Sequence, residues 1–261
     1  AQFPRGMGRK VIPYGWVEAA ASPEQQAAPG TWIRLGADIA SDGGDEFVIA
    51  RAEGFAIRLV HRSSGAANVD PVAVAGVITQ ATREACELRD RVGDEQLVHV
   101  KIDASGLGWG VAGLVKRQVE EMQLPARVFG VRGEDKPHDE TQFRNARSEI
   151  AWSMRRLMRP HEGWGKIKLV DAPTRLIAQY QAPHYSTDSA GRIVVEKKRD
   201  MKARGVGSPD LADACSLAVY EPADSGPASV ERAPATKIPL RPTDIAQGAG
   251  ATVIPLGPTR R

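Results

Sequence analysis

Hydrophobic and polar positions in the first half of this chain follow a period of two in several short stretches. Residues 31–39, 46–52 and 55–61 alternate or are rich in β-branched side chains, and Gly54 separates the last two stretches. This pattern predicts a meander of three antiparallel strands. Residues 96–102 and 126–131 have the same character and predict two more strands.

Longer stretches repeat hydrophobic side chains every three to four residues, which predicts helices. Asp70 and Pro71 are typical of the start of a helix, which then continues to about Arg91. Ser208 and Pro209 are expected to begin the last helix in the same way, with Ser208 as its N-cap. Further helices are expected at 109–122, 142–159 and 173–181, and a hairpin turning at Gly191 is expected at 184–187 and 192–196.

The order of these elements predicts an α/β fold in which helices flank a mixed sheet. The antiparallel three-strand meander is extended by parallel strands. Aspartates on the first strand and at the end of the fourth are the RNase H-like arrangement. This domain is expected at 31–221. Residues 1–30 contain four prolines and are expected to be a linker, with one or two helical turns near residues 17–21; residues 222–261 contain seven prolines without periodicity and are expected to be a flexible tail.

The composition is that of an ordinary globular protein, and it argues against a disulfide-stabilised, membrane-spanning or secreted protein. The 261 residues carry a net charge of +3, which by itself does not require a nucleic-acid partner. Cys86 and Cys215 lie in apolar helical patterns and are expected to be buried thiols without a disulfide partner. No apolar run is long enough for a membrane span, and no signal-peptide pattern is present. Since the chain begins with Ala in mid-pattern, we expect it to be part of a longer protein.

Three short acidic segments are the most informative feature. Asp38 (with Asp45 nearby) and Asp103 follow strand-like runs, and Asp210 and Asp213 lie in the first turn of the last helix. Taken singly, the strand-end aspartates suit Asx turns and the helix-start aspartates suit the helix dipole. Asp213 is expected to be buried, because alanines flank it. Together, convergent carboxylates suit Mg²⁺ and metal-assisted phosphodiester hydrolysis.

Basic residues cluster in two later segments. Such clusters are usually solvated faces, and the sharper interpretation is a groove that follows a DNA backbone without reading bases. The residues concerned are Arg144, Arg147, Arg155 and Arg159 in one segment and Lys197, Lys198, Lys202 and Arg204 in the other. A dinucleotide loop at 106–111 is disfavoured, because Val111 stands where that motif needs its third glycine.

Four stretches together resemble the C-terminal nuclease domain of the large terminase subunit of tailed double-stranded DNA bacteriophages. The resemblance covers roughly residues 31–220, and its last stretch is the most specific. The opening at Ile12-Pro13 and 16–20 is also similar to the segment that leaves the ATPase domain in that family. The four stretches are Gly36-Ala37-Asp38-Ile39-Ala40 with Gly44-Asp45, residues 101–108, residues 143–149 and residues 196–214.

The resemblance implies an endonuclease that cuts concatemeric viral DNA during packaging in the host bacterial cytoplasm. It implies Asp38, Asp103 and Asp210 as ligands of two Mg²⁺ or Mn²⁺ ions, with Asp213 as a neighbour or alternative third ligand. Lys198 falls where the family has a basic residue near the site. No Walker A motif occurs, so the packaging ATPase is expected outside this chain. The portal and the small terminase subunit are the expected protein partners.

Two other interpretations also fit the sequence. The chain also suits another RNase H-like nuclease, of the resolvase or transposase type, which cutting of four-way junctions distinguishes. A non-catalytic module that docks on the portal or the small terminase subunit is the alternative from a different class. Binding without metal-dependent cleavage distinguishes that one.

Overall fold

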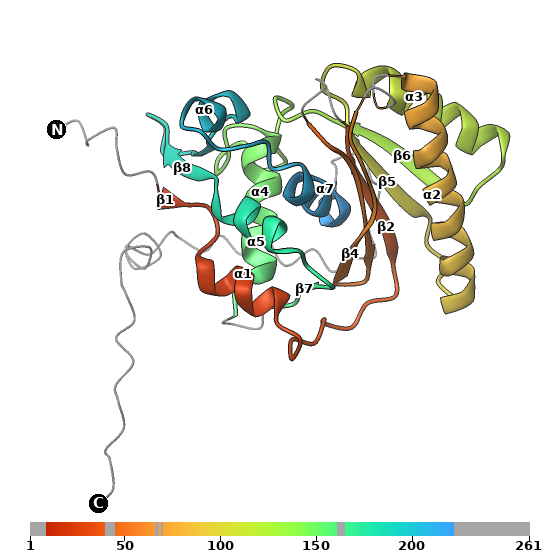
Figure 1. The fold of residues 1–261 in the computed structure, drawn as a ribbon, viewed down its shortest axis with the longest axis horizontal. Coiled ribbons are helices and arrows are strands. Elements are labelled where there is room, and N and C mark those ends of the chain that lie inside the picture. The colour runs from red at the N-terminus through yellow and green to blue at the C-terminus, as the bar shows by residue number, and fades with distance from the viewer. Residues whose placement is uncertain (1–8, 40–44, 66–67, 69, 161–164, 222–261) are drawn as a thin grey trace, which may run out of the picture. The chain divides into compact units, whose positions relative to one another are not determined.

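A six-stranded mixed sheet forms the centre of the domain (Figure 1). The structure is a computed structural model that describes residues 9–39, 45–65, 68, 70–160 and 165–221. The strand order is β6-β5-β2-β3-β4-β7; β2, β3 and β4 are antiparallel neighbours, and β5 and β6 extend the sheet in parallel. The predicted fold class is therefore confirmed. The strands are β2 (Ile33–Asp38), β3 (Phe47–Glu53), β4 (Ala56–Ser63), β5 (Val98–Asp103), β6 (Ala126–Val131) and β7 (Lys168–Leu169).

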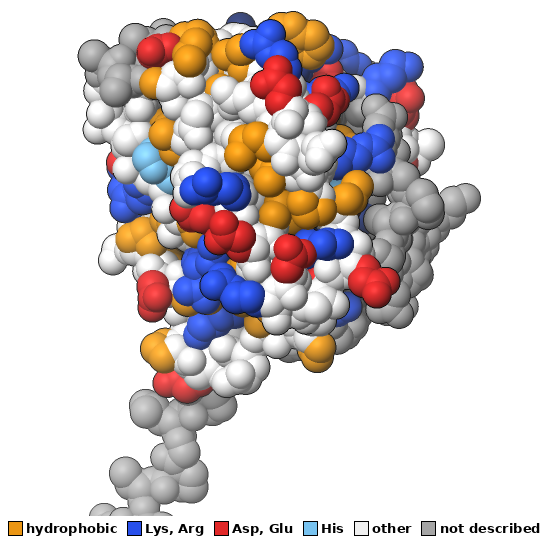
Figure 2. Space-filling model, turned by 90° about the vertical axis from the view of Figure 1, so that its right-hand side faces the viewer, with side chains coloured by type: hydrophobic (Ala, Val, Ile, Leu, Met, Phe, Trp, Pro, Cys, Tyr) orange, Lys and Arg blue, Asp and Glu red, His pale blue; other side chains and the backbone are white. Residues whose placement is uncertain are grey.

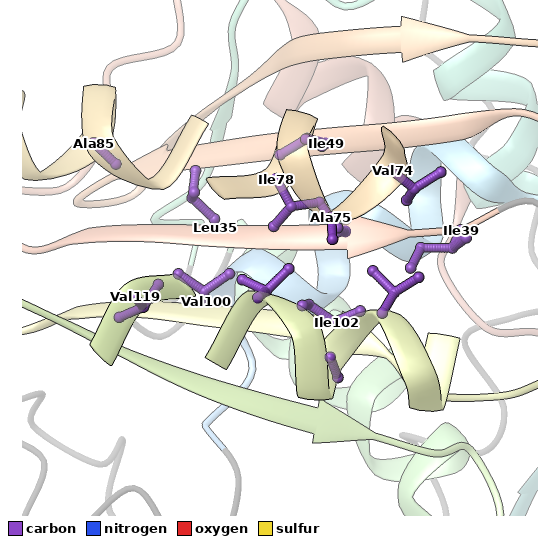
Figure 3. Packing of buried hydrophobic residues seen from close by; sticks show 14 of the residues in the cluster. Leu35, Ile39, Ile49, Val74, Ala75, Ile78, Ala85, Val100, Ile102 and Val119 are labelled. Atoms are coloured by element: carbon purple, nitrogen blue, oxygen red, sulfur yellow. The ribbon is translucent and has the colours of Figure 1, made fainter. Parts of the chain in front are cut away.

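Side chains of β2 and β5 alternate between the two faces of the sheet, as the period of two requires. Leu35, Val100 and Ile102 belong to one hydrophobic core (Figure 3). The helices α2 (Pro71–Val92) and α3 (Gly108–Glu121) cover this face (Figure 1). Asp70 caps α2 as predicted, since its side chain accepts a hydrogen bond from the backbone N–H of Val72 at 2.9 Å.

The opposite face of the sheet carries α7 (Asp210–Val219), which lies against β2 and β3. The two backbones approach closely at Gly36, where an added Cβ would lie 2.2 Å from the carbonyl oxygen of Ala214 and 2.3 Å from the nitrogen of Ala218. The residue therefore has to be glycine for α7 to reach the sheet. The outer helices that contact α7 are α4 (Ala146–Met158) and α5 (Thr174–Gln181).

The first described residues contain more regular structure than the predicted connector. A short strand β1 (Arg9–Lys10) pairs with β8 (His184–Thr187), which forms the predicted hairpin with β9 (Ile193–Val195). The helix α1 (Tyr14–Ala21) packs against α4, α5 and β7 and buries Val17 completely. Residues 1–8 and the predicted tail at 222–261 lie outside the described residues.

Two helix starts differ from the prediction. The helix expected from residue 142 begins at Ala146, because Asn145 is its N-cap and accepts a hydrogen bond from the N–H of Ser148. Ser208 does not cap α7, and its hydroxyl has no partner among the described residues. Gln179 of α5 serves instead: its amide oxygen accepts from the N–H of Ala212, and its amide nitrogen donates to the carbonyl oxygen of Ser208, both at 3.1 Å.

A buried charge cluster holds the other end of α7. Glu221 pairs with Arg34 of β2 at 2.6 Å and with Lys101 of β5 at 3.2 Å, and it hydrogen-bonds the ring of His99 at 3.0 Å. Burial alone raises the pKa of Glu221, but these neighbours outweigh it and hold the pKa at about 2. Burial lowers the pKa of Lys101 to about 7, although Glu221 opposes this. Because three donors share the carboxylate, we expect it to stay ionised at neutral pH.

Replacement of Glu221 by Gln is expected to lower the free energy of unfolding by about 3 kcal/mol at pH 7, because Arg34 and Lys101 keep their burial and lose the neutralising charge. The pKa of Glu221 is below its ordinary 4.5 in the folded state, so its contribution is present above about pH 4.5 and is lost towards pH 2. Urea unfolding from pH 7 to pH 3 measures this. The difference between wild type and variant should shrink as the pH falls; a constant difference would contradict the ion-pair explanation.

None of the described helices is long and apolar enough to cross a membrane.

Candidate active site

Asp38 and Asp103 lie at the same edge of the sheet, at the carboxyl ends of β2 and β5. The parallel register pairs Ala37 with Ile102, so the two aspartates follow on neighbouring strands, which are about 5 Å apart. Both belong to the alternate positions that face the α7 side. Asp38 is 2% exposed. The carboxyl ends of parallel strands are where open α/β sheets bind ligands.

The turn after Asp103 is held by the Asp103 carboxylate and by close packing of the backbone at Gly108. One carboxylate oxygen of Asp103 accepts a hydrogen bond from the N–H of Ser105 at 3.0 Å, so the predicted Asx turn is present. An added Cβ at Gly108 would lie 1.8 Å from the carbonyl oxygen of Asp103, so this position requires glycine. The turn holds the backbone of Asp103 firmly while its second carboxylate oxygen makes no hydrogen bond within the turn.

The helix α7 brings Asp210 and Asp213 to the same edge. Asp210 is 2% exposed, and its carboxylate accepts a hydrogen bond from the N–H of Glu46, at the start of β3, at 3.0 Å. The side chain of Asp213 is 29% exposed. The expected burial of Asp213 is therefore only partial, because its side chain points to the side that α6 (Lys198–Ala203) approaches, whereas Ala214 lies against β2.

Lys198 is the cation that faces these carboxylates. Its ammonium nitrogen lies 2.9 Å from an oxygen of Asp213 and 3.3 Å from an oxygen of Asp38. Burial lowers the pKa of Lys198, but the two aspartates outweigh it and the pKa is raised. For Asp213, burial raises the pKa, while Lys198 and Arg147 outweigh burial and lower it. Arg147 is thus a second basic group near the carboxylates.

The pKa of Asp38 lies well above its ordinary value of 3.8. Burial is the largest cause, and the negative charges of Asp213, Asp103 and Asp210 add to it, while Lys198 acts in the opposite direction. A buried carboxylate among three others is costly without a cation. Acids whose pKa is raised in this way are concentrated at functional sites.

The other predicted site residues either lie around the carboxylate edge or are held by other partners. Lys202 lies 3.4 Å from Asp45, next to the start of β3. Arg144, which is exposed, and Arg147 flank the start of α4, and Lys197 precedes α6. Arg204, in contrast, is bound by Glu196 at 2.7 Å.

Arg155 and Arg159 lie towards the far end of α4, about 12 Å and about 18 Å along the helix axis from Arg147. The guanidinium of Arg155 packs 4.9 Å from the ring of Trp16 and 4.8 Å from that of Trp152. Arg159 lies 6.0 Å from Trp16. The structure therefore does not bring these two arginines to the carboxylates.

The donor set suits a hard divalent cation, because every convergent acid offers oxygen only. Among the described residues, however, no three acidic, His or Cys side chains approach closely enough to hold one metal ion in this arrangement. Lys198 takes the neutralising position instead. The chemistry of the site thus fits a divalent ion, and its binding would require the carboxylates to exchange part of their contact with Lys198.

Sequence reasoning missed how α6 and the Glu46 amide complete this site. The six residues of α6 are too few to show a helical period, although Asp200 in the first turn and Lys202 in the last suit the helix dipole. The contact between Glu46 and Asp210 joins residues 164 positions apart, for which no local signal exists.

Comparison with solved structures gives the nuclease domain of the large terminase subunit gp2 of bacterial virus Sf6. The identity is 20% and the TM-score is 0.60, over 82% of this chain and 100% of that chain. A mutant of the same domain with calcium gives 20% and 0.61, and one with manganese gives 19% and 0.60, with equal coverage. No protein-family model and no curated protein matches the chain. At this identity the likeness confirms the expected fold.

Proposed function

We propose that this chain is a metal-dependent DNA endonuclease of the large-terminase type, which cuts viral DNA during genome packaging. The observation that carries the proposal is the convergence of Asp38, Asp103, Asp210 and Asp213 at one sheet edge, where burial foremost, and then the neighbouring negative charges, raise the pKa of Asp38. The shared fold with the Sf6 nuclease domain supports it. That domain has been solved with manganese and with calcium, which supports a divalent ion here.

In this proposal Asp38, Asp103 and Asp210 hold two Mg²⁺ or Mn²⁺ ions, with Asp213 as neighbour or alternative ligand. Such ions supply Lewis-acid activation of water and neutralise charge on the phosphate. The chain itself positions the ligands. The strand ends and α7 hold the carboxylates in place, and the backbone N–H of Glu46 orients Asp210. Lys198 and Arg147 place positive charge beside the scissile phosphate.

Plasmid cleavage with Mg²⁺ or Mn²⁺ is the direct test, and excess EDTA is expected to stop it completely. Binding should also be visible without chemistry: at ten times the Kd, an ion stabilises the fold by about 1.4 kcal/mol, on the order of 4 °C in Tm. The increase in Tm should be absent in Asp38→Asn and retained in the control Asp90→Asn, whose side chain is 62% exposed on α2. Undiminished cutting in EDTA would sink the metal mechanism.

We infer that the DNA backbone follows the basic residues around the carboxylate edge. The face covered by α2 and α3 is less suitable, because acidic and basic side chains are interspersed there (Figure 2). The proposed contacts at the edge are Arg144, Arg147, Lys197, Lys198 and Lys202. Arg155, Arg159 and Arg204 remain predicted contacts, with their engagement by Trp16, Trp152 and Glu196 as the competing structural role.

Replacement of Arg147 by Ala is expected to weaken binding to all duplex sequences alike. It should also flatten the salt dependence by about one unit of slope, because one phosphate contact is lost. Fluorescence anisotropy in EDTA at several salt concentrations measures both quantities. Arg83→Ala, on the exposed part of α2, is the matched control and should change neither. A loss confined to some sequences would point to base readout instead.

The alternatives are separated by the same assays. Preferred cutting of four-way junctions would favour a resolvase-type nuclease, and DNA or protein binding without metal-dependent cutting would favour a docking module. Within the proposal, the chain acts in the bacterial cytoplasm beside an ATPase domain, the portal and the small terminase subunit. Residues 1–30 would lead from that ATPase domain, and residues 222–261 would be dispensable for cleavage.

A further inference from the structure

Trp109 is the most exposed large hydrophobic side chain among the described residues, at 68%. Tryptophan is usually well buried, so a ring this open needs a reason. Its neighbours Gly108 and Gly110 carry no side chains that would shield it, and the space beside Gly110 is open. The ring therefore projects from the first turn of α3 towards solvent.

Arg132 accompanies this ring in a defined arrangement. Its guanidinium carbon lies 5.9 Å from the centre of the Trp109 ring. Asp135 orients the guanidinium through contacts of 2.8 and 2.9 Å to its oxygen, yet the Arg132 side chain stays 55% exposed. An arginine held beside an exposed indole offers a positive charge and an apolar surface side by side.

The pair lies next to the proposed catalytic edge. Trp109 follows the turn that packs on the backbone of Asp103, and Arg132 follows the last residue of β6, Val131, whose register partner is Asp103. In the strand order β6-β5-β2, the end of β6 is two strand spacings from Asp38, about 10 Å. Since base pairs are spaced about 3.4 Å along a duplex, this distance equals about three base pairs.

We propose that Trp109 and Arg132 form a DNA contact within about three nucleotides of the scissile phosphate. Trp109 packs against a deoxyribose of the backbone, and Arg132 neutralises the adjoining phosphate. Such a contact does not depend on sequence, because every nucleotide carries the same sugar and phosphate. The pair thereby positions the strand at the carboxylates. This inference rests on the proposed nuclease function, and it adds a platform that none of the basic segments contains.

The test compares Trp109→Ala, Trp109→Phe and Arg132→Ala in the whole chain. Binding to fluorescein-labelled DNA is measured in EDTA, and plasmid cleavage is measured in Mn²⁺. Trp109→Ala should raise the Kd and KM about tenfold, which corresponds to about 1.4 kcal/mol of lost apolar contact, and should leave kcat, Tm and the salt slope nearly unchanged. Trp109→Phe should keep most of the affinity. Arg132→Ala should lower the salt slope by about one unit.

Met122→Ala is the matched control, since Met122 follows the last turn of the same helix and is 48% exposed. It should bind and cut as wild type does. If wild type cuts DNA and Trp109→Ala has an unchanged Kd and KM, this inference is overturned and the nuclease proposal stands. The same holds if Trp109→Ala alters only self-association in sedimentation, because the ring then faces a protein. If wild type neither binds nor cuts DNA, the nuclease proposal itself fails.

Discussion

Asp38→Asn is expected to reduce DNA cleavage by on the order of 10³-fold or more while leaving the fold intact. Charge neutralisation by a bound ion contributes several kcal/mol to phosphodiester hydrolysis, and each 1.36 kcal/mol corresponds to a factor of ten in rate. The amide keeps the shape of the side chain but removes the negative charge from the centre of the carboxylate group. Single-turnover cleavage of a plasmid in Mn²⁺ measures the loss.

The stability of the same variant should change in the opposite sense. The pKa of Asp38 is raised in the folded state, foremost by burial, so its contribution to stability is present at low pH and is lost as the pH rises through the folded pKa. At pH 8 in EDTA, the neutral amide should therefore leave Tm equal to that of wild type or higher. Near-wild-type cutting by Asp38→Asn would remove this residue from the site, and a large fall in Tm would assign it a structural role.

Gly36→Val is expected to lower the free energy of unfolding by about 3 kcal/mol, and to lower cleavage even under conditions where the variant is folded. The added Cβ would overlap the backbone of Ala214 and Ala218 in α7. Backbone atoms of a helix cannot rotate out of the way as a side chain can, so the whole helix would have to move. Overpacking typically costs 1–3 kcal/mol, and this contact is at the upper end. Since Asp210 and Asp213 lie on α7, its displacement also moves two of the proposed ligands.

Urea unfolding and cleavage well below the transition midpoint check both parts. Gly113→Ala is the matched control: Gly113 lies within α3, and its Cβ would meet nothing within 4 Å. That change should stabilise the domain by about 0.5–1 kcal/mol, because alanine favours the helix. If Gly36→Val were as stable and as active as wild type, close contact between α7 and β2 would not be what positions the carboxylates.

The local pattern of hydrophobic and polar residues was sufficient to predict the main strands and helices of the domain. The alternation in 31–39 and 96–102 predicts β2 and β5, and Asp38 and Asp103 end these strands as predicted. Asp70 caps α2 because capping depends on the side chain two residues from the amide that it binds. Both thiols are buried, as their apolar surroundings indicate. Where residues close in the sequence decide the stability of an element, the sequence alone was enough to predict that element.

The counter-charges of the site depended on packing between distant segments. Lys198 reaches Asp38 across 160 positions, so no local pattern indicates this pair, and only the family resemblance placed Lys198 near the site. At the other end of α7, the pair of Glu221 and Lys101 spans 120 positions and likewise leaves no local signal. The cap of α7 comes from Gln179 and not from the adjacent Ser208, because tertiary contact supplies a donor and an acceptor together. Arg155 was predicted to follow DNA from its charge alone, whereas its packing on Trp16 is visible only once α1 lies against α4.

Sequence by itself thus determined which carboxylates lie at strand and helix ends. The tertiary structure decided which cations neutralise them, since that free energy depends on distance and burial, which the order of residues does not reveal.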